Sequence, residues 1–192
     1  MQTDIDSKSF KFAELVFEQF DYLRTEFGYE VVQSSSNHVQ YHSDKVIINI
    51  YYEEYSSELE FEIRFIRETE PKKFSLPIIL KAIGYNGQTF FQASEATTLK
   101  WCVSHIATIV KTYCQDILKG TDEAFKVLEN AYRTITEETK QYYTVEPIKN
   151  KALAAWQHKN FKEVVLLYQS VESELNAMEK KRLTYARHKL EK

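Results

Sequence analysis

The sequence predicts an α+β fold, in which an N-terminal helix and an antiparallel meander sheet are followed by a helical C-terminal region. Three observations carry this prediction. Apolar residues recur with a helical period in residues 9–27 and again beyond residue 94. Between residues 29 and 66 they alternate with polar ones, as they do in strands. The chain has 192 residues, 43% of them hydrophobic and 14% aromatic, which is enough to bury a core.

The first element is an amphipathic helix over residues 9–27. Its apolar residues are spaced three or four positions apart: Ala13, Val16, Phe17, Phe20, Leu23 and Phe27. Gly28 suits a left-handed C-terminal cap, so the helix is expected to end there and to lead into an extended segment over residues 29–33.

Three further strands are predicted over residues 38–42, 46–52 and 59–66, which are rich in Val, Ile, Tyr and Phe. The connections between them are short enough for hairpins. In the last strand Leu59 and Phe61 alternate with Glu60 and Glu62. The sheet should therefore have one packed face and one polar face that is wet or covered by a partner.

Helical spacing returns after the sheet. The predicted helices cover residues 76–83, 94–118, 121–143, 148–158, 161–176 and 177–190. Pro147 is expected to separate the third of these from the fourth. Two domains follow from this pattern: an α+β domain over residues 1–93 and a helical region over residues 94–192.

The tail has small and aromatic residues at regular spacing. They are Ala152, Ala155, Trp156, Phe161, Val164, Val165 and Tyr168. Over residues 148–176 this pattern resembles a tetratricopeptide-like helical hairpin. The aromatic members Trp156, Phe161 and Tyr168 are interpreted as hairpin core rather than as the lining of a peptide groove.

A second resemblance covers residues 1–66. It rests on an aromatic-rich helix leading to Phe27-Gly28-Tyr29, and on Val39-Gln40-Tyr41-His42-Ser43, Val46-Ile47-Ile48-Asn49-Ile50-Tyr51 and Ser56-Ser57-Glu58-Leu59-Glu60. These segments are similar to those of small bacterial proteins of immunity or defence-associated type. The resemblance implies a domain that binds a toxin or another protein of a defence operon.

The charge of −3 is unevenly distributed. Residues 1–70 carry 6 Lys or Arg against 15 Asp or Glu, whereas residues 147–192 carry 10 against 5. This pattern differs from that of a uniformly basic nucleic-acid-binding protein. No segment reaches the roughly 18 consecutive apolar residues of a membrane span. The sequence therefore predicts a cytoplasmic protein with neither a membrane nor a nucleic acid as partner.

Motifs for catalysis or cofactor binding are missing from the sequence. Its four glycines form no phosphate-binding loop, and its histidines and cysteines lack metal-ligand spacing. His38 and His42 share one side of a strand and are expected to be solvated. Cys102 and His105 lie three apart, but Cys102 belongs to an apolar stripe and is expected to be an inert thiol, as is Cys114 in the same helix. We predict no catalytic residue, metal or cofactor.

The strongest polar feature is an acidic, tyrosine-rich hairpin. We predict that Tyr51, Tyr55, Glu58, Glu60 and Glu62 bind a cognate protein, so that the chain is a non-catalytic component of a bacterial immunity or anti-phage defence system. One alternative is a metal-dependent hydrolase or nuclease that uses the same carboxylates. Another is a helical scaffold subunit of a larger assembly.

Overall fold

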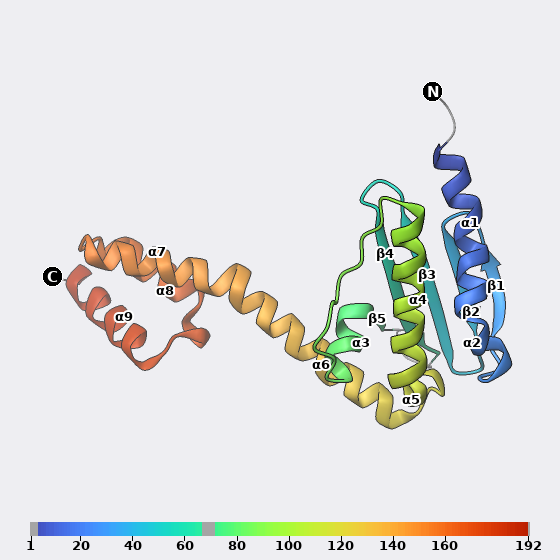
Figure 1. Cartoon of the computed structure of the whole chain (residues 1–192). Coiled ribbons are helices and arrows are strands. Elements are labelled where there is room, and N and C mark those ends of the chain that lie inside the picture. Colours follow the sequence, from blue (N-terminus) through green and yellow to red (C-terminus); the bar gives the residue numbers. More distant parts are fainter. Residues whose placement is uncertain (1–3, 67–71, 192) are drawn as a thin grey trace. The chain divides into compact units, whose positions relative to one another are not determined.

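The computed structural model describes residues 4–66 and 72–191, with side chains from residue 12 onward. The chain divides into two compact units, Met1–Tyr132 and Arg133–Lys192, which we call the N-terminal and C-terminal units. Figure 1 shows a sheet with helices in the first unit and helices alone in the second. Helix α6 (Asp122–Lys140) continues across the division between them.

Within the described residues, five antiparallel strands form one sheet whose spatial order follows the chain. The strands are β1 (Glu30–Ser34), β2 (His38–His42), β3 (Val46–Glu53), β4 (Glu58–Phe65) and β5 (Lys73–Ser75). This confirms the predicted α+β class and the meander. The sequence missed β5, because three residues are too few to show an alternation. Between β3 and β4, Ile48 pairs with Ile63 and Asn49 with Glu62, so apolar and polar pairs alternate between the two faces.

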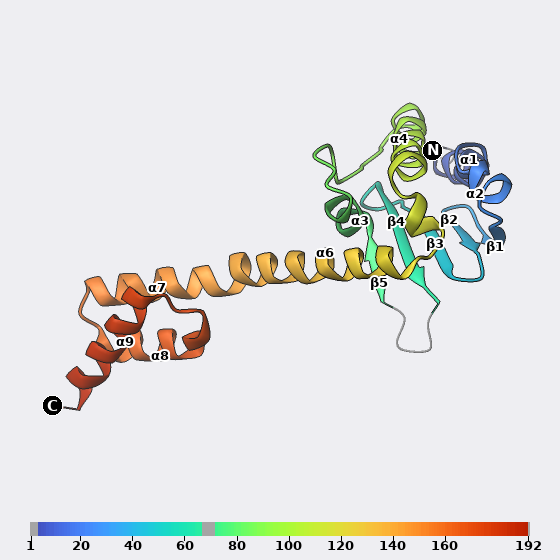
Figure 2. The same ribbon diagram turned by 90° about the horizontal axis from the view of Figure 1, so that it is seen from below.

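The helices of the N-terminal unit pack on the apolar face of the sheet. They are α1 (Asp4–Gln19), α2 (Asp21–Thr25), α3 (Leu76–Ala82), α4 (Ala96–Tyr113), α5 (Gln115–Leu118) and the first part of α6. Figure 2 shows α1, α2 and α4 on one side of the strands. Ring centroids lie 5.9 Å apart both for Phe20 and Phe61 and for Phe12 and Tyr52. These contacts join helix to sheet in a shared core.

Two predicted helices are interrupted. The first breaks at Phe20, between α1 and α2, and the second at Cys114, between α4 and α5. Both residues leave the helical conformation, with φ of −107° and −108°, yet both are buried. The change of direction keeps apolar residues after each break, such as Leu23 and Ile117, in the core. Cys102 therefore lies in α4, whereas Cys114 is the residue at the break, and both are free and buried.

The described residues of the C-terminal unit form helices joined by short turns. Helix α6 passes through a π-helical turn, Gln141–Val145, into α7 (Glu146–Gln157). The helices that follow are α8 (Phe161–Ser170), the short 3₁₀ helix Glu172–Glu174 and α9 (Ala177–Leu190). The prediction that Pro147 separates two helices is wrong: Pro147 lies in the first turn of α7, next to the π-helical turn. The irregular turn accommodates a residue that has no N–H to donate.

A small core holds this unit together. It contains Val145, Ala152, Ala155, Val164, Tyr168, Val171, Leu175, Leu183 and Ala186. The alanines of α7 let α8 approach closely, and Leu183 and Ala186 bring α9 to the same cluster. Asn176 begins α9 with a capping box in which Glu179 is the reciprocal partner.

The observed division after Tyr132 differs from the predicted one after residue 93. Helix α4 lies in the N-terminal unit because it contributes to the core on the sheet. Its residues Val103, Ile106 and Val110 are buried, and the hydroxyl of Tyr22 donates a hydrogen bond to the carbonyl oxygen of Ala107 at 3.1 Å.

Candidate functional site

The face of the sheet opposite the helices is polar, and we call it the open face. Its residues follow from the strand register: His38, Gln40 and His42 of β2; Ile47, Asn49, Tyr51 and Glu53 of β3; Glu58, Glu60, Glu62 and Arg64 of β4; and Lys73 and Ser75 of β5. The other face is in ring contact with the helical side of the unit: Phe12 of α1 contacts Tyr52, Phe20 contacts Phe61, and Phe125 of α6 contacts Phe65.

Asn49 is the centre of a hydrogen-bond network on this face. Its side-chain oxygen accepts a hydrogen bond from Gln40 Nε2 at 2.7 Å and lies 3.1 Å from His38 Nε2. Its amide nitrogen donates to Glu62 Oε1 at 3.3 Å. Asn49 is only 1% exposed. Three neighbours from two strands therefore satisfy this buried amide and fix its orientation.

Glu62 is neutralised within the sheet. Arg64 Nη2 lies 3.5 Å from one of its oxygens and Lys73 Nζ 3.4 Å from the other. The carboxylate of Glu62 is also a hydrogen-bond acceptor for Asn49. Of the acidic residues predicted to form the site, Glu62 is thus a positioning residue of the network rather than a free charge.

Tyr51 forms an aromatic platform beside this network. The imidazole of His38 stacks on its ring, with centroids 4.2 Å apart and an interplanar angle of 11°. The side chain is half-buried. Burial raises the pKa of Tyr51, and the nearby carboxylate of Glu62 adds to the effect. The phenol therefore presents a neutral hydroxyl and an apolar ring.

Two buried polar atoms of the open face have no hydrogen-bond partner among the described residues. They are His42 Nε2 and Arg64 Nε. His42 and Arg64 flank Ile47, because Ile47 pairs with one of them on each side. The Nε of an arginine is always a donor, and an unsatisfied buried donor costs about 1–3 kcal/mol.

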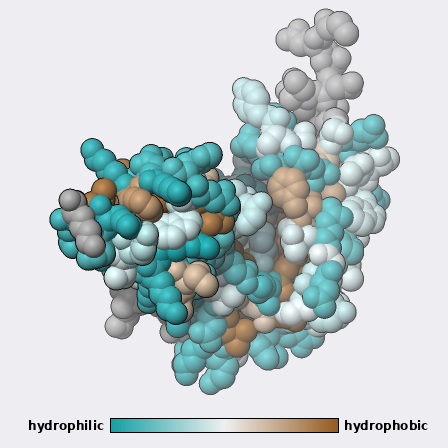
Figure 3. Space-filling model, turned by 90° about the vertical axis from the view of Figure 1, so that its left-hand side faces the viewer, coloured by the Kyte–Doolittle hydropathy of each residue, from teal (hydrophilic) through white to brown (hydrophobic). Residues whose placement is uncertain are grey.

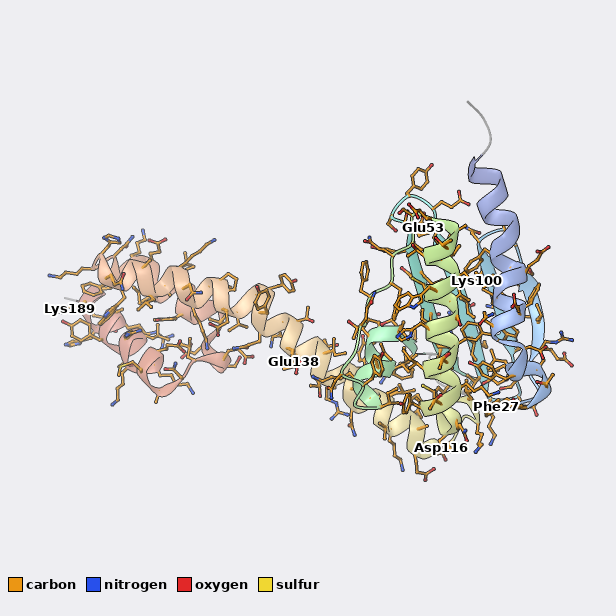
Figure 4. All side chains as sticks on the ribbon, in the orientation of Figure 1. Phe27, Glu53, Lys100, Asp116, Glu138 and Lys189 are labelled. Carbon is orange, nitrogen blue, oxygen red and sulfur yellow. The ribbon has the colours of Figure 1, made fainter. Side chains whose placement is uncertain are left out.

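The structure brings together most, but not all, of the predicted site. Tyr51, Glu58, Glu60 and Glu62 share the open face, whereas Tyr55 is fully exposed in the β3–β4 hairpin turn. Figure 4 labels Glu53 at this end of the sheet. Glu53 pairs directly with Glu58.

The prediction missed the residues that organise the face: His38, Gln40, Asn49, Arg64 and Lys73. It was wrong about His38 and His42, since both are half-buried rather than solvated. The one signal in the sequence was Asn49 itself, a polar residue in the middle of an apolar strand. Its cross-strand partners depend on the register of the strands, which could not be predicted from the sequence.

The thiol of Cys102 is set in the core, as predicted. It is 1% exposed, and burial raises its pKa, which disfavours the thiolate. His105, the candidate base, stacks on Trp101 with ring centroids 4.8 Å apart, and its Nε2 lies 3.3 Å from the hydroxyl of Tyr85. The Cys102 thiol itself donates to the carbonyl oxygen of Gln92, at 3.8 Å.

The acidic hairpin is where the alternative prediction, a metal-dependent hydrolase or nuclease, places a metal ion. Within residues 4–66 and 72–191, no group of three or more His, Cys, Asp or Glu side chains is arranged to hold a metal ion. Successive carboxylates of one strand face are about 7 Å apart along the strand. The innermost of them, Glu62, already has two cationic partners.

No family model, curated protein or solved structure matches this chain. Among the described helices, none combines the length and the apolar character that are needed to cross a bilayer.

Proposed function

We propose that this protein is a non-catalytic protein-binding component that binds a cognate protein on the open face of its sheet. The observation that carries the proposal is the network around Asn49. A side chain that is 1% exposed holds His38, Gln40 and Glu62 in place on a face that the packed helices leave uncovered. Polar groups that are already ordered lose little entropy when a partner binds.

The chemistry of the face suggests what the partner presents. Glu53 and Glu60 are exposed near the hairpin end, and among the described residues neither makes an ion pair like those of Glu62. Carboxylates of this kind accelerate the approach of a basic surface. Tyr51 offers the amphipathic contact area that is enriched in interfaces.

The biological setting that we propose is bacterial immunity or defence, with a toxin or a defence-complex subunit as the partner. This part of the proposal follows from the sequence resemblance alone. Such a partner is produced in the same host as this protein, and the experiment that captures it is therefore carried out in the native host.

The first experiment locates the interface. The photo-reactive residue p-benzoylphenylalanine is placed at position 60 of the full-length chain, or at position 14 on the exposed side of α1 as the control. We expect a protein in the native host to cross-link at position 60 and not at position 14. Equal cross-linking at both positions would indicate non-specific capture and contradict the proposal.

The second experiment measures affinity for the protein so identified. The double change Glu58→Lys and Glu60→Lys should weaken binding about tenfold or more and reduce its dependence on salt. The matched control is Glu14→Lys with Glu18→Lys, which makes the same charge change on exposed positions of α1. If both pairs leave the affinity unchanged, the open face is not the binding surface.

The hydrolase hypothesis has its own measurement. Calorimetric titration of the full-length chain with Mg²⁺ or Mn²⁺ should give no saturable heat if the carboxylates serve recognition. Saturable binding that is lost in Glu60→Gln would support a metal-dependent enzyme instead. The scaffold hypothesis stays a prediction.

A further inference from the structure

The C-terminal unit contains an open groove of about 860 Å³ between the end of α7, the start of α8 and one side of α9. All of its lining residues belong to this unit, so it is a different surface from the open face. Figure 3 shows apolar side chains between hydrophilic ones on the surface of the C-terminal unit.

The floor of the groove is aromatic. Trp156 and Tyr185 have ring centroids 5.5 Å apart, and Phe161 lies 5.9 Å from Trp156 and 5.8 Å from Tyr185. All three pairs meet edge to face, at angles of 66–73°. Met178 adds a flexible apolar side chain that is 59% exposed. Trp156 and Phe161 thus form part of a groove, and the prediction that they belong only to the hairpin core is incomplete. Tyr168, the third aromatic residue of that prediction, is fully buried.

The rim of the groove is cationic. Lys159, Lys181, Arg182 and Lys189 line it, and none of its described lining residues is acidic. Lys189 Nζ lies 5.4 Å from the centre of the Tyr185 ring, and Figure 4 labels this residue in α9.

Three other cations of the same unit are paired with carboxylates. Lys140 pairs with Glu174, Lys149 with Glu179 and Arg187 with Glu172. None of the four rim residues makes such an ion pair within the described part of the chain. The positive charge of the rim is thus directed at solvent over an apolar floor.

We propose that this groove binds an acidic peptide segment of a protein partner. An apolar side chain of the segment would lie on the Trp156–Phe161–Tyr185 floor, and its carboxylates would face the four cations of the rim. Charge complementarity selects an acidic ligand. The rigid aromatic cluster provides contact area at a low cost in conformational entropy, and Met178 adapts to the shape of the anchor.

The ring geometry favours a peptide over single-stranded nucleic acid. Proteins that bind single strands stack successive bases on open aromatic faces. Here each ring points an edge at its neighbour, and Lys189 lies over the face of Tyr185. The cluster resembles a pocket for one bulky side chain more than a row of platforms.

Fluorescence anisotropy of the full-length chain tests the proposal. The probe is a short fluorescein-labelled peptide of Asp and Glu with a central Leu-Phe pair. Replacing Leu-Phe of the peptide by Ser-Ser should weaken binding about tenfold or more. The double variant Lys181→Glu with Arg182→Glu of the chain should weaken binding of the Leu-Phe peptide by a similar factor. The matched control, Lys151→Glu with Lys162→Glu, changes two exposed cations outside the groove and should retain binding.

A second readout reports on the groove directly. The chain has two tryptophans, Trp101 and Trp156. In Trp101→Phe, the remaining emission comes from Trp156 at the floor, and the peptide should change it with the same midpoint as the anisotropy. Met178→Glu, which places a carboxylate in the groove at an exposed position, should abolish both signals.

Three results would overturn the proposal. The first is equal binding of the Leu-Phe and Ser-Ser peptides, or equal loss in the groove and control variants. The second is displacement of the peptide by a poly-dT oligonucleotide that binds more tightly than the peptide. If the groove variants also abolish binding of this oligonucleotide, the groove is assigned to nucleic acid. The third is a dimer in sedimentation velocity that is abolished by Met178→Glu and not dissociated by the peptide, which would assign it to a second copy of the chain.

Discussion

The imidazole of His38 and the phenol of Tyr51 stack almost parallel, with ring centroids 4.2 Å apart. The two residues are directly paired between β2 and β3. His38 also contacts the buried oxygen of Asn49 through Nε2. One side chain of β2 therefore connects the aromatic part of the open face to its hydrogen-bond network.

This pair should contribute a measurable coupling energy. In a double-mutant cycle of His38→Ala and Tyr51→Ala, urea denaturation should give about 0.5–1 kcal/mol of interaction free energy. The control cycle combines His38→Ala with Glu60→Ala, since Glu60 lies on the same face one strand further away. Additive losses in the first cycle would show that the stacking does not stabilise the fold.

Asn49 should be the most sensitive polar position of the open face. Asn49→Ala leaves Gln40 and His38 without their shared acceptor and Glu62 without a donor, in a site shielded from water. We expect the free energy of unfolding to fall by about 1–3 kcal/mol. Gln33→Ala, at an exposed position of β1, should stay within about 0.5 kcal/mol of the parent. Similar small losses in both variants would mean that water replaces the network.

Asn49 and its partners show which features of the open face could be predicted from the sequence alone. Alternation in β3 and β4 predicted the two faces of the sheet and put Tyr51, Glu60 and Glu62 on the same one. It could not show that Glu62 is neutralised, because the cation Lys73 comes from β5, a strand of three residues. The helical period similarly predicted α4 but not its end at Cys114, since the break follows from tertiary packing and leaves the apolar pattern unchanged.

The hairpin contains an unfavourable charge pair. Glu53 and Glu58 are directly opposite each other at the end of β3 and β4. Glu53→Lys should stabilise the fold by about 0.2–1 kcal/mol at low ionic strength, because it converts like charges into opposite ones. Added salt should reduce the gain. Glu54→Lys makes the same charge change outside the ladder, and an equal effect there would point to net charge instead of the cross-strand pair.

Cys114 should make the fold sensitive to alkali. Burial raises the pKa of its thiol from 9.0 to about 12. Above pH 9 the unfolded chain releases this proton while the folded chain keeps it. The contribution of the thiol to the free energy of unfolding is therefore complete below pH 9 and is lost as the pH rises towards 12. Between pH 9 and 10 the loss from one such group is about 1 kcal/mol. The decrease measured by urea denaturation over this interval should be smaller by that amount in Cys114→Ala, and identical pH dependence in the two chains would contradict the assignment.

Two glycines separate the cost of a left-handed backbone from the cost of a close contact. Gly28 and Gly120 have φ of +71° and +64°. A Cβ added at Gly28 would meet nothing within 4 Å. A Cβ added at Gly120 would lie 2.7 Å from Lys45 Cβ and 2.9 Å from Val46 Cγ2. Gly28→Ala should therefore cost about 1–2 kcal/mol, the conformational penalty alone. Gly120→Ala should cost more, because the chain after α5 must move away from the start of β3. Thermal or urea denaturation measures the loss in stability of both variants. Equal losses would show that the β2–β3 turn moves aside without a cost in stability.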